Sequence, residues 1–117
     1  MALVESNLVE AVTNKRTIAA KCHIRIKGNS VTAVLDSGAA VSIITKRLIK
    51  NLGLEIDSLL KIVVVIMNRT KERAIGQINK VNIIVHNIMV PMKLQVIESL
   101  EETLLLGTDW FEKTSTK

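Results

Sequence analysis

Aromatic residues are scarce in this sequence, which has no tyrosine, one phenylalanine and one tryptophan among 117 residues. Proteins that bind single-stranded nucleic acid stack the bases on aromatic side chains, so this shortage argues against such a platform. The net charge of +5 could attract phosphates, but the basic residues are scattered among aspartates and glutamates, as on a solvated surface. We therefore expect no nucleic-acid partner.

Cysteines, metal-ligand clusters and long apolar runs are also few or missing. The one cysteine, Cys22, excludes an internal disulfide and fits a reducing, cytoplasmic compartment. Cys22 and His23 would point to opposite faces of a strand, which argues against a thiol protease, and Cys22 is expected in the core. No residues have zinc-site spacing, so no metal or other cofactor is expected. No apolar run reaches the roughly 18 residues of a membrane span, and the N-terminus lacks a signal-peptide pattern.

Aliphatic residues, in contrast, are abundant. Hydrophobic residues make up 48% of the chain and aromatics only 2%, so the core must consist of valine, isoleucine and leucine. Valine and isoleucine favour strands, because branching at Cβ suits a pleated surface. A chain of this length forms one domain. We expect a compact all-β domain with one or two short helices at residues 17–112, between an N-terminal arm (1–16) and a polar tail (113–117).

The first half of this domain is predicted to contain a hairpin, a short strand and a helix. These elements are expected at residues 20–26, 31–35, 39–44 and 45–54. The four residues between the first two strands have the composition of a turn. Thr45 could cap the helix and Gly53 could stop it, and its apolar residues Leu48, Ile49 and Leu52 fall on one face.

The second half is predicted to be mostly strand. The predicted strands cover residues 61–67, 74–78, 81–85, 88–96 and 104–106. A polar break at residues 68–73 makes the first two of these a hairpin with an exposed tip. Pro91 indicates an edge, a bulge or an irregular start in the fourth strand. A short helix is expected after Gly107.

The motif most suggestive of chemistry is Asp36-Ser37-Gly38-Ala39. Apolar segments precede and follow it. An isolated buried carboxylate is costly, and aspartate is poorly suited to strand interiors. Either the loop exposes Asp36 in an ordinary turn, for which Asp-Ser-Gly is common material, or the carboxylate performs a task. The triplet alone favours the turn.

A second motif near the other end of the domain changes this interpretation. The segment Leu104-Leu105-Leu106-Gly107-Thr108-Asp109-Trp110 combines an apolar strand, a glycine and a polar helix start. Together and in this order, the two motifs resemble the retropepsin family: the proteases of retroviruses, of long-terminal-repeat retrotransposons and of related cellular proteins. The resemblance covers about residues 20–111, and the Gly-Thr-Asp-Trp-Phe ending is more similar to the retrotransposon enzymes.

The resemblance implies a retropepsin-like fold and a role for each matching position. Asp36 would be the catalytic aspartate, the Ser37 hydroxyl would brace two active-site loops across a dimer, and Gly38 would let backbone approach the substrate. Gly107 would end the last core strand behind the catalytic loop. Residues 66–75 would form a flap that closes over bound peptide. Substrate contacts are implied for Ala39, Ala40, Ile66, Met67, Asn68 and Ile75.

Two departures from the retroviral pattern concern this loop and the flap. Retroviral enzymes commonly pair an acid two residues past the catalytic glycine with an arginine after the later glycine, and here these positions are Ala40 and Thr108. Because both partners are absent together, no unpaired buried charge remains, and we interpret this as a subfamily difference. The flap tip, residues 68–71, has no glycine, so its closure is expected to differ.

One suitable aspartate per chain implies a symmetric homodimer. Peptide hydrolysis by this route needs an acid and a base, and two neighbouring carboxyls share one proton. Asp57 and Asp109 are expected to have structural roles, in a connection and at a helix start. A second Asp36 from a twofold-related copy would complete the site. The prediction is an aspartic endopeptidase that acts on extended peptides, with polyprotein processing as its task, in the cytoplasm or within a virus-like particle.

Two other interpretations stay open. The same fold could serve as a catalytically silent dimerisation or peptide-binding module, although such a module need not keep an acid at Asp36. A generic β domain could instead carry Asp-Ser-Gly as an incidental turn, and it would be a monomer in solution.

Overall fold

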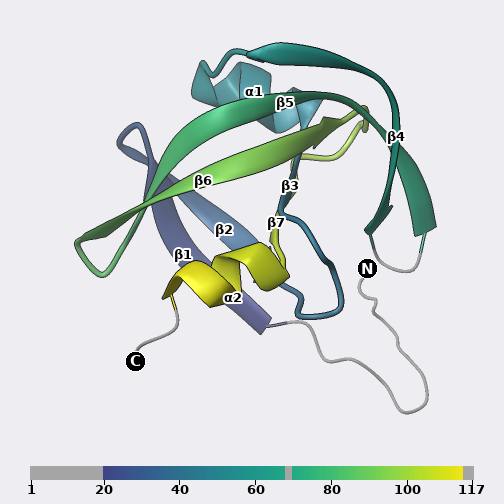
Figure 1. Cartoon of the computed structure of the whole chain (residues 1–117). Helices are drawn as coiled ribbons and strands as arrows, with labels where there is room; N and C mark the ends of the chain where they lie inside the picture. Colours follow the sequence, from purple (N-terminus) through teal and green to yellow (C-terminus); the bar gives the residue numbers. More distant parts are fainter. Residues whose placement is uncertain (1–19, 68–69, 115–117) are drawn as a thin grey trace.

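The computed structural model describes residues 20–67 and 70–114, and of residues 60–72 it describes no side chains. Seven strands and two short helices make up this described part (Figure 1). In chain order they are β1 (Ala20–Ile26), β2 (Asn29–Leu35), β3 (Ile43–Thr45), α1 (Lys46–Leu52), β4 (Ser58–Met67), β5 (Thr70–Val85), β6 (Ile88–Ile97), β7 (Leu104–Leu106) and α2 (Thr108–Thr114). The predicted arm, residues 1–16, lies outside the described residues, as do residues 115–117 of the predicted tail.

The predicted first hairpin is confirmed, with a shorter turn than expected. Strands β1 and β2 pair antiparallel from Ala20 opposite Leu35 to Ile26 opposite Asn29. The turn consists of Lys27 and Gly28 alone, both with positive φ, 52° and 80°. Two-residue turns of this kind match the twist of the flanking strands. The alternation of apolar residues along both strands places one face of the hairpin in the core.

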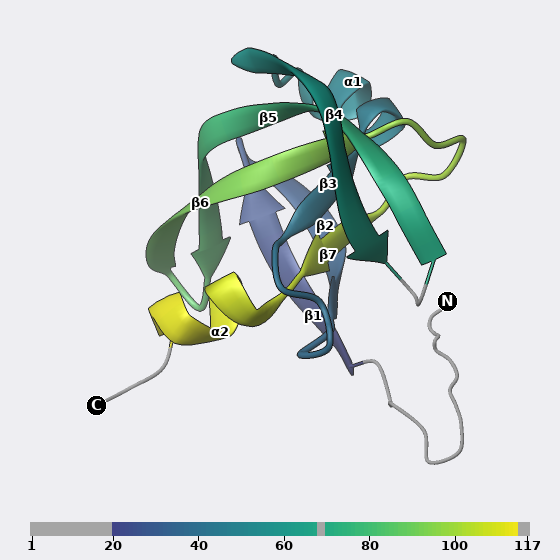
Figure 2. The same ribbon diagram turned by 45° about the vertical axis from the view of Figure 1, so that its right-hand side comes forward.

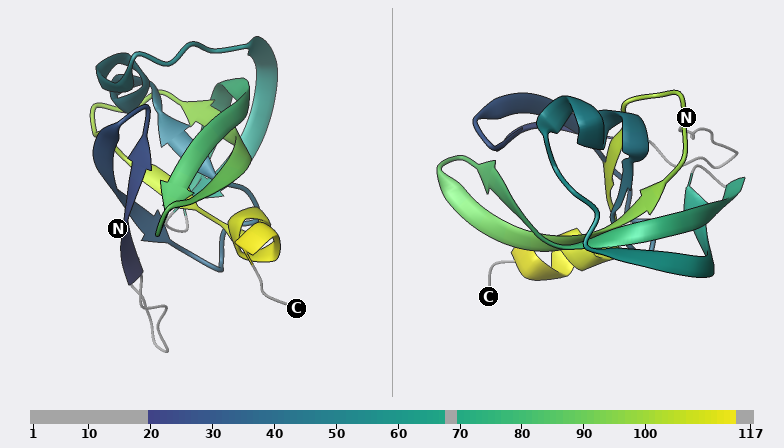
Figure 3. Two further views of the ribbon diagram at one scale, coloured as in Figure 1. Left: turned by 90° about the vertical axis from the view of Figure 1, so that its left-hand side faces the viewer. Right: turned by 90° about the horizontal axis from the view of Figure 1, so that it is seen from above.

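The sheet brings together segments that are far apart in the chain. Its strand order is β1-β2-β7-β3-β6-β5-β4, and a further pairing of Arg25 with Ile84 joins β1 to β5. Figure 3 shows the long curved ribbons of β5 and β6 on one side and the β1–β2 hairpin on the other. Strand β7 lies parallel to β2 and antiparallel to β3. The loop that connects β2 to β3, residues 36–42, must therefore pass the C-terminal end of β7.

The predicted strand at residues 39–44 is wrong in most of its length. Only Ile43 to Thr45 form β3, and the preceding apolar residues belong to the loop. The reason is that backbone groups of this loop form hydrogen bonds with residues of α2 and not with a neighbouring strand. The Ala39 carbonyl oxygen accepts the Thr108 N–H, and the Ser42 N–H donates to the Asp109 side chain.

The predicted strands at residues 74–78 and 81–85 are one continuous strand, β5, which already begins at Thr70. Residues 70–73 of the predicted break pair with β4 through their backbones, as Arg73 does with Val64, and residues 68–69 lie outside the described residues. The ladder to β6 shifts between Ile78 and Val81, so the irregularity interrupts the pairing but not the strand. Pro91 lies in the part of β6 that pairs with β5 alone, in agreement with the edge position expected for a proline.

Helix α1 agrees with its predicted pattern, but Thr45 has a different role. Thr45 occupies the N-cap position without a capping hydrogen bond from its side chain, and its hydroxyl oxygen instead accepts the Thr103 N–H at 3.0 Å. Gly53 ends the helix in the left-handed conformation, with φ of 71°. The predicted apolar face is buried and consists of Leu48, Ile49 and Leu52.

No helix of the described part is long and apolar enough to cross a membrane.

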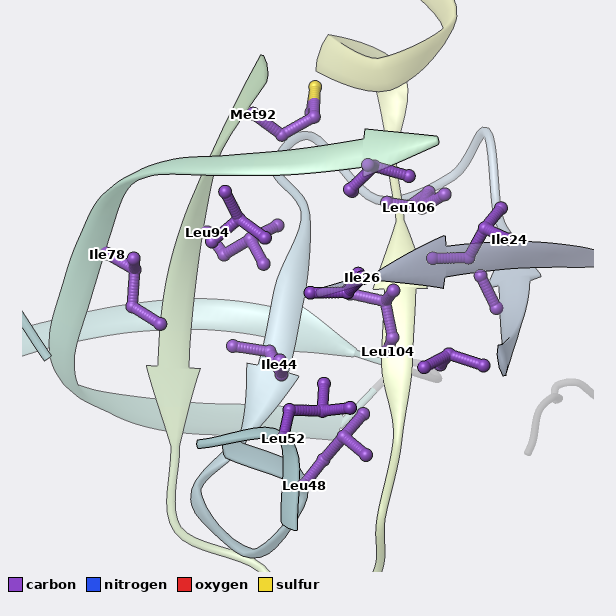
Figure 4. Packing of buried hydrophobic residues seen from close by; sticks show 14 of the residues in the cluster. Ile24, Ile26, Ile44, Leu48, Leu52, Ile78, Met92, Leu94, Leu104 and Leu106 are labelled. Atoms are coloured by element: carbon purple, nitrogen blue, oxygen red, sulfur yellow. The ribbon is translucent and has the colours of Figure 1, made fainter. Parts of the chain in front are cut away.

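The core is aliphatic, as the composition predicts. Isoleucine and leucine side chains from strands β1, β3, β5, β6 and β7 and from α1 pack together in its main cluster (Figure 4). Trp110 in α2 is 5% exposed and packs against the same cluster. Cys22 is only partly buried at the edge of this cluster, while its neighbour His23 is exposed and lies 3.2 Å from the Thr32 hydroxyl.

Candidate active site

The loop of residues 36–42, here called the Asp36 loop, begins at the end of β2, where β2 pairs with β7. Leu35 pairs with Leu106, and the next backbone N–H, that of Asp36, donates to the Leu106 carbonyl oxygen at 3.0 Å. Asp36 is half-buried and Ser37 and Gly38 are exposed. The loop lies on the same side of the molecule as the end of β4 and the start of β5 (Figures 1 and 2).

The Asp36 carboxylate is held by its own loop. Its Oδ1 accepts the Gly38 N–H at 2.8 Å, and the Ala39 N–H donates to the Asp36 carbonyl oxygen at 3.1 Å. A Cβ on Gly38 would come within 3.1 Å of the same Oδ1, which is tighter than most contacts between such atoms. A glycine at this position therefore leaves room for the carboxylate to receive the backbone hydrogen bond.

Gly107, at the end of β7, lies directly against this loop. A Cβ on Gly107 would stand 2.5 Å from the Ala39 carbonyl oxygen and 2.7 Å from that of Val41. Both contacts are with backbone atoms, which cannot rotate out of the way as a side chain can. Only glycine therefore allows β7 to end against the Asp36 loop.

Thr108, the residue after Gly107, forms hydrogen bonds with backbone carbonyl groups of the Asp36 loop. Its N–H donates to the Ala39 carbonyl oxygen at 2.7 Å. Its hydroxyl lies 3.0 Å from the same oxygen and 3.2 Å from the Ser37 carbonyl oxygen. One hydroxyl proton is shared between the two acceptors, so both residues that flank Gly38 are held through their carbonyl groups.

Ser42 and Asp109 fix the end of the loop. Ser42 is fully buried; its hydroxyl donates to Asp109 Oδ1 at 2.7 Å and accepts the Gly107 N–H at 3.1 Å. The Ser42 N–H donates to Asp109 Oδ2 at 3.1 Å. Asp109 Oδ1 also accepts the Trp110 N–H at 2.8 Å, which agrees with the structural role expected for Asp109 at a helix start. Its link to Ser42 was not foreseen from sequence, although a serine inside an apolar run was a signal.

The residues predicted to contact substrate differ in how far their side chains are buried. The Ala39 side chain is 2% exposed and Ala40 is exposed, while Ile75 packs partly against the main core cluster. Ile66 and Met67 end β4, and their side chains are not described. Asn68 lies outside the described residues. The substrate contacts implied for these residues stay predictions.

Two further features bear on ligands. A hollow of about 580 Å³ opens beside α2, where Val41 and Asp109 meet three lysines, Lys80, Lys93 and Lys113; Asp36 does not line it. Among the side chains that the structure describes, no three from histidine, cysteine, aspartate or glutamate gather closely enough to hold a metal ion. Asp57 accepts the Asn79 N–H at 2.7 Å, a structural role as expected.

Known proteins match this chain both in sequence family and in fold. The family model described as gag-polyprotein putative aspartyl protease matches residues 22–113. The retroviral protease-like domain of Ddi1 from Leishmania major is 24% identical, with a TM-score of 0.67 over 83% of this chain and 78% of that chain. EIAV protease, in complex with the inhibitor HBY-793, is 16% identical, with a TM-score of 0.67 over 91% of this chain and 97% of that chain. No curated protein matches the sequence. At these identities the two solved structures share its fold, and a fold alone does not establish an activity.

Proposed function

Because this chain belongs to the gag-polyprotein aspartyl protease family and has a retropepsin-like fold, we propose that it is an aspartic endopeptidase that acts as a homodimer. The observation that carries the proposal is the setting of Asp36. Its half-buried carboxylate stands at the end of a core strand, with one oxygen held by the Gly38 N–H. A carboxylate in an incidental turn would not require the close backbone packing found at Gly107.

The proposed chemistry needs two carboxyl groups with different protonation. One Asp36 carboxylate removes a proton from water, and the water oxygen forms a bond to the carbon of the scissile peptide. The protonated Asp36 of the second subunit hydrogen-bonds the carbonyl oxygen. The peptide C–N bond then breaks as the leaving nitrogen takes up the proton that the first carboxylate removed from water. Two carboxyls at close range share one proton, so a site on a twofold axis supplies both forms from one residue.

The substrate is proposed to be an extended peptide, with polyprotein processing as the biological task. The β4–β5 hairpin ends on the same side as the Asp36 loop (Figure 2). A peptide bound between the loop and such a hairpin can add strand-like backbone hydrogen bonds, while alternate side chains enter pockets. Family membership in gag-polyprotein proteases supports a polyprotein as the source of the peptide.

The proposal is tested by incubating a mixed peptide library with the wild-type chain and with Asp36→Asn, between about pH 4 and 7 to include a pair that shares one proton. Asp57→Asn is the matched control, because the Asp57 side chain accepts the backbone N–H of Asn79 and an asparagine side-chain oxygen can do the same. We expect cleavage by the wild type and by the control, and none by Asp36→Asn. Cleavage by Asp36→Asn would contradict the mechanism. A wild-type dimer without cleavage would favour a silent dimerisation or peptide-binding module.

A further inference from the structure

One peptide group connects Thr108 to the Asp36 carboxylate. The carbonyl oxygen of Ser37 lies 3.2 Å from the Thr108 hydroxyl. The N–H of the same peptide group belongs to Gly38 and donates to Asp36 Oδ1 at 2.8 Å. The hydroxyl proton, the peptide group and the carboxylate therefore form a short chain of hydrogen bonds.

We propose that Thr108 is a positioning residue for Asp36 and acts through the Ser37–Gly38 peptide; this inference rests on the proposed catalytic function of Asp36. A peptide group is planar, so a contact that fixes the direction of its C=O also fixes the direction of its N–H. Hydrogen bonds in a chain also polarise one another. Thr108 thus sets where the Gly38 N–H points, and that N–H sets where Asp36 Oδ1 lies.

The loop needs such a contact because of its composition. Gly38 is the residue with the greatest backbone freedom in the loop and it is exposed. Thr108 holds both of its neighbours, through the Ser37 carbonyl oxygen at 3.2 Å and the Ala39 carbonyl oxygen at 3.0 Å from its hydroxyl. With both neighbours held, the orientation of the peptide before Gly38 is restricted on either side.

Thr108 is itself well fixed. The preceding residue, Gly107, packs against loop backbone, and its N–H donates to the buried Ser42 hydroxyl. The following residue, Asp109, accepts two hydrogen bonds from Ser42. A branched Cβ further restricts the Thr108 side chain to few rotamers. The position from which the hydroxyl acts is therefore determined by the end of β7 and the start of α2.

Thr108 holds the Asp36 loop without a charged pair. Neither Ala40 nor Thr108 is charged, so no ion pair joins these two positions. The threonine hydroxyl and N–H satisfy backbone carbonyls directly instead. Catalysis depends steeply on geometry, since a displacement of about 1 Å can cost about 100-fold in rate. In a homodimer, the same displacement would occur in both copies of the loop and would move both Asp36 carboxylates.

The test compares Thr108→Val, which keeps the shape and loses the hydroxyl, with Thr108→Ser, which keeps the hydroxyl. Thr32→Val is the matched control, because it removes an exposed threonine hydroxyl that lies near His23. We expect Thr108→Val to lower kcat by about 10- to 100-fold, with a small change in KM and with the Tm and the dimer fraction retained. Thr108→Ser should restore most of kcat, and Thr32→Val should match the wild type.

A second readout does not depend on cleavage. Hydrogen exchange of the Gly38 amide, followed by NMR, should be about tenfold faster in Thr108→Val than in the wild type or Thr108→Ser, because the peptide is no longer held. If the wild-type chain cleaves nothing, the proposed function fails and this exchange result still decides whether Thr108 orients the peptide. An unchanged kcat with unchanged Gly38 exchange in Thr108→Val would overturn the inference. A loss of kcat that merely follows the loss of folded dimer would also overturn it.

Discussion

Ser42 and Asp109 are joined by two hydrogen bonds, from the serine hydroxyl to Oδ1 at 2.7 Å and from the serine N–H to Oδ2 at 3.1 Å. The serine hydroxyl also accepts the Gly107 N–H. These contacts attach the end of the Asp36 loop to the start of α2. The loop is therefore held by groups from the opposite end of the chain, and its geometry depends on the complete fold.

Replacing Ser42 by alanine should strongly destabilise the protein. The change leaves the buried Gly107 N–H without its acceptor and removes the Ser42 hydroxyl donor from the partly buried Asp109. Unsatisfied buried polar groups cost about 1–3 kcal/mol each, so we expect the free energy of unfolding to fall by about 2–4 kcal/mol. Urea unfolding measures this change. Ser30→Ala, at an exposed position, should stay within about 0.5 kcal/mol of wild type, and an equal effect of both variants would refute this role of Ser42.

Replacing Gly107 by alanine should prevent the native packing of the Asp36 loop. The added Cβ would lie 2.5 Å from one backbone oxygen and 2.7 Å from another. We expect a loss of more than about 4 kcal/mol in the free energy of unfolding, or no folded protein, measured by circular dichroism during thermal melting. Gly28→Ala is the control: its Cβ meets no atom within 4 Å, although φ is +80°, so it should cost about 1 kcal/mol. Near-native stability of Gly107→Ala would show that the loop can move aside.

Replacing a buried leucine by alanine should lower the free energy of unfolding far more than replacing an exposed leucine. Leu94 is 0% exposed and Leu100 is 86% exposed. Leu94→Ala removes apolar contacts and leaves a cavity, which costs about 2–5 kcal/mol. Leu100→Ala should change the free energy of unfolding by less than about 0.5 kcal/mol. Urea midpoints of the two variants measure the contrast, and a large effect of Leu100→Ala would indicate that this side chain is covered in solution.

Local patterns in the sequence predicted those elements that depend on local rules. The alternation along residues 20–35 predicted the first hairpin, and one apolar face and Gly53 predicted α1. The Asp-Ser-Gly triplet pointed to a loop at Asp36, where the structure has one. Each of these signals lies within a few residues of the feature that it predicts.

The errors lie where distant residues decide the structure. The apolar residues before Ile43 have strand composition, but Asp109 and Thr108 bind their backbone and hold them in a loop. These contacts exist because β7 lies between β2 and β3, which no local pattern indicates. For the same reason, the sequence did not predict that Ser42 and Thr108 would hold the Asp36 loop.

A shared active site should make activity depend on protein concentration. Only paired chains carry two Asp36 carboxylates, so activity per chain should rise with concentration until most chains are dimers. Cleavage rates over a dilution series, together with sedimentation at the same concentrations, measure this dependence. Constant activity per chain across a range in which sedimentation finds monomers would contradict a site built from two subunits.

The most direct test of the central claim is to mix wild-type and Asp36→Asn chains, refold them together at a concentration where dimers dominate, and measure cleavage at constant total protein. With equal amounts and random pairing, about one quarter of the dimers contain two wild-type chains. If each active site needs both Asp36 carboxylates, cleavage should fall to about one quarter of the wild-type rate. A fall to only about one half would mean that each chain acts by itself, and would contradict an active site shared between two subunits.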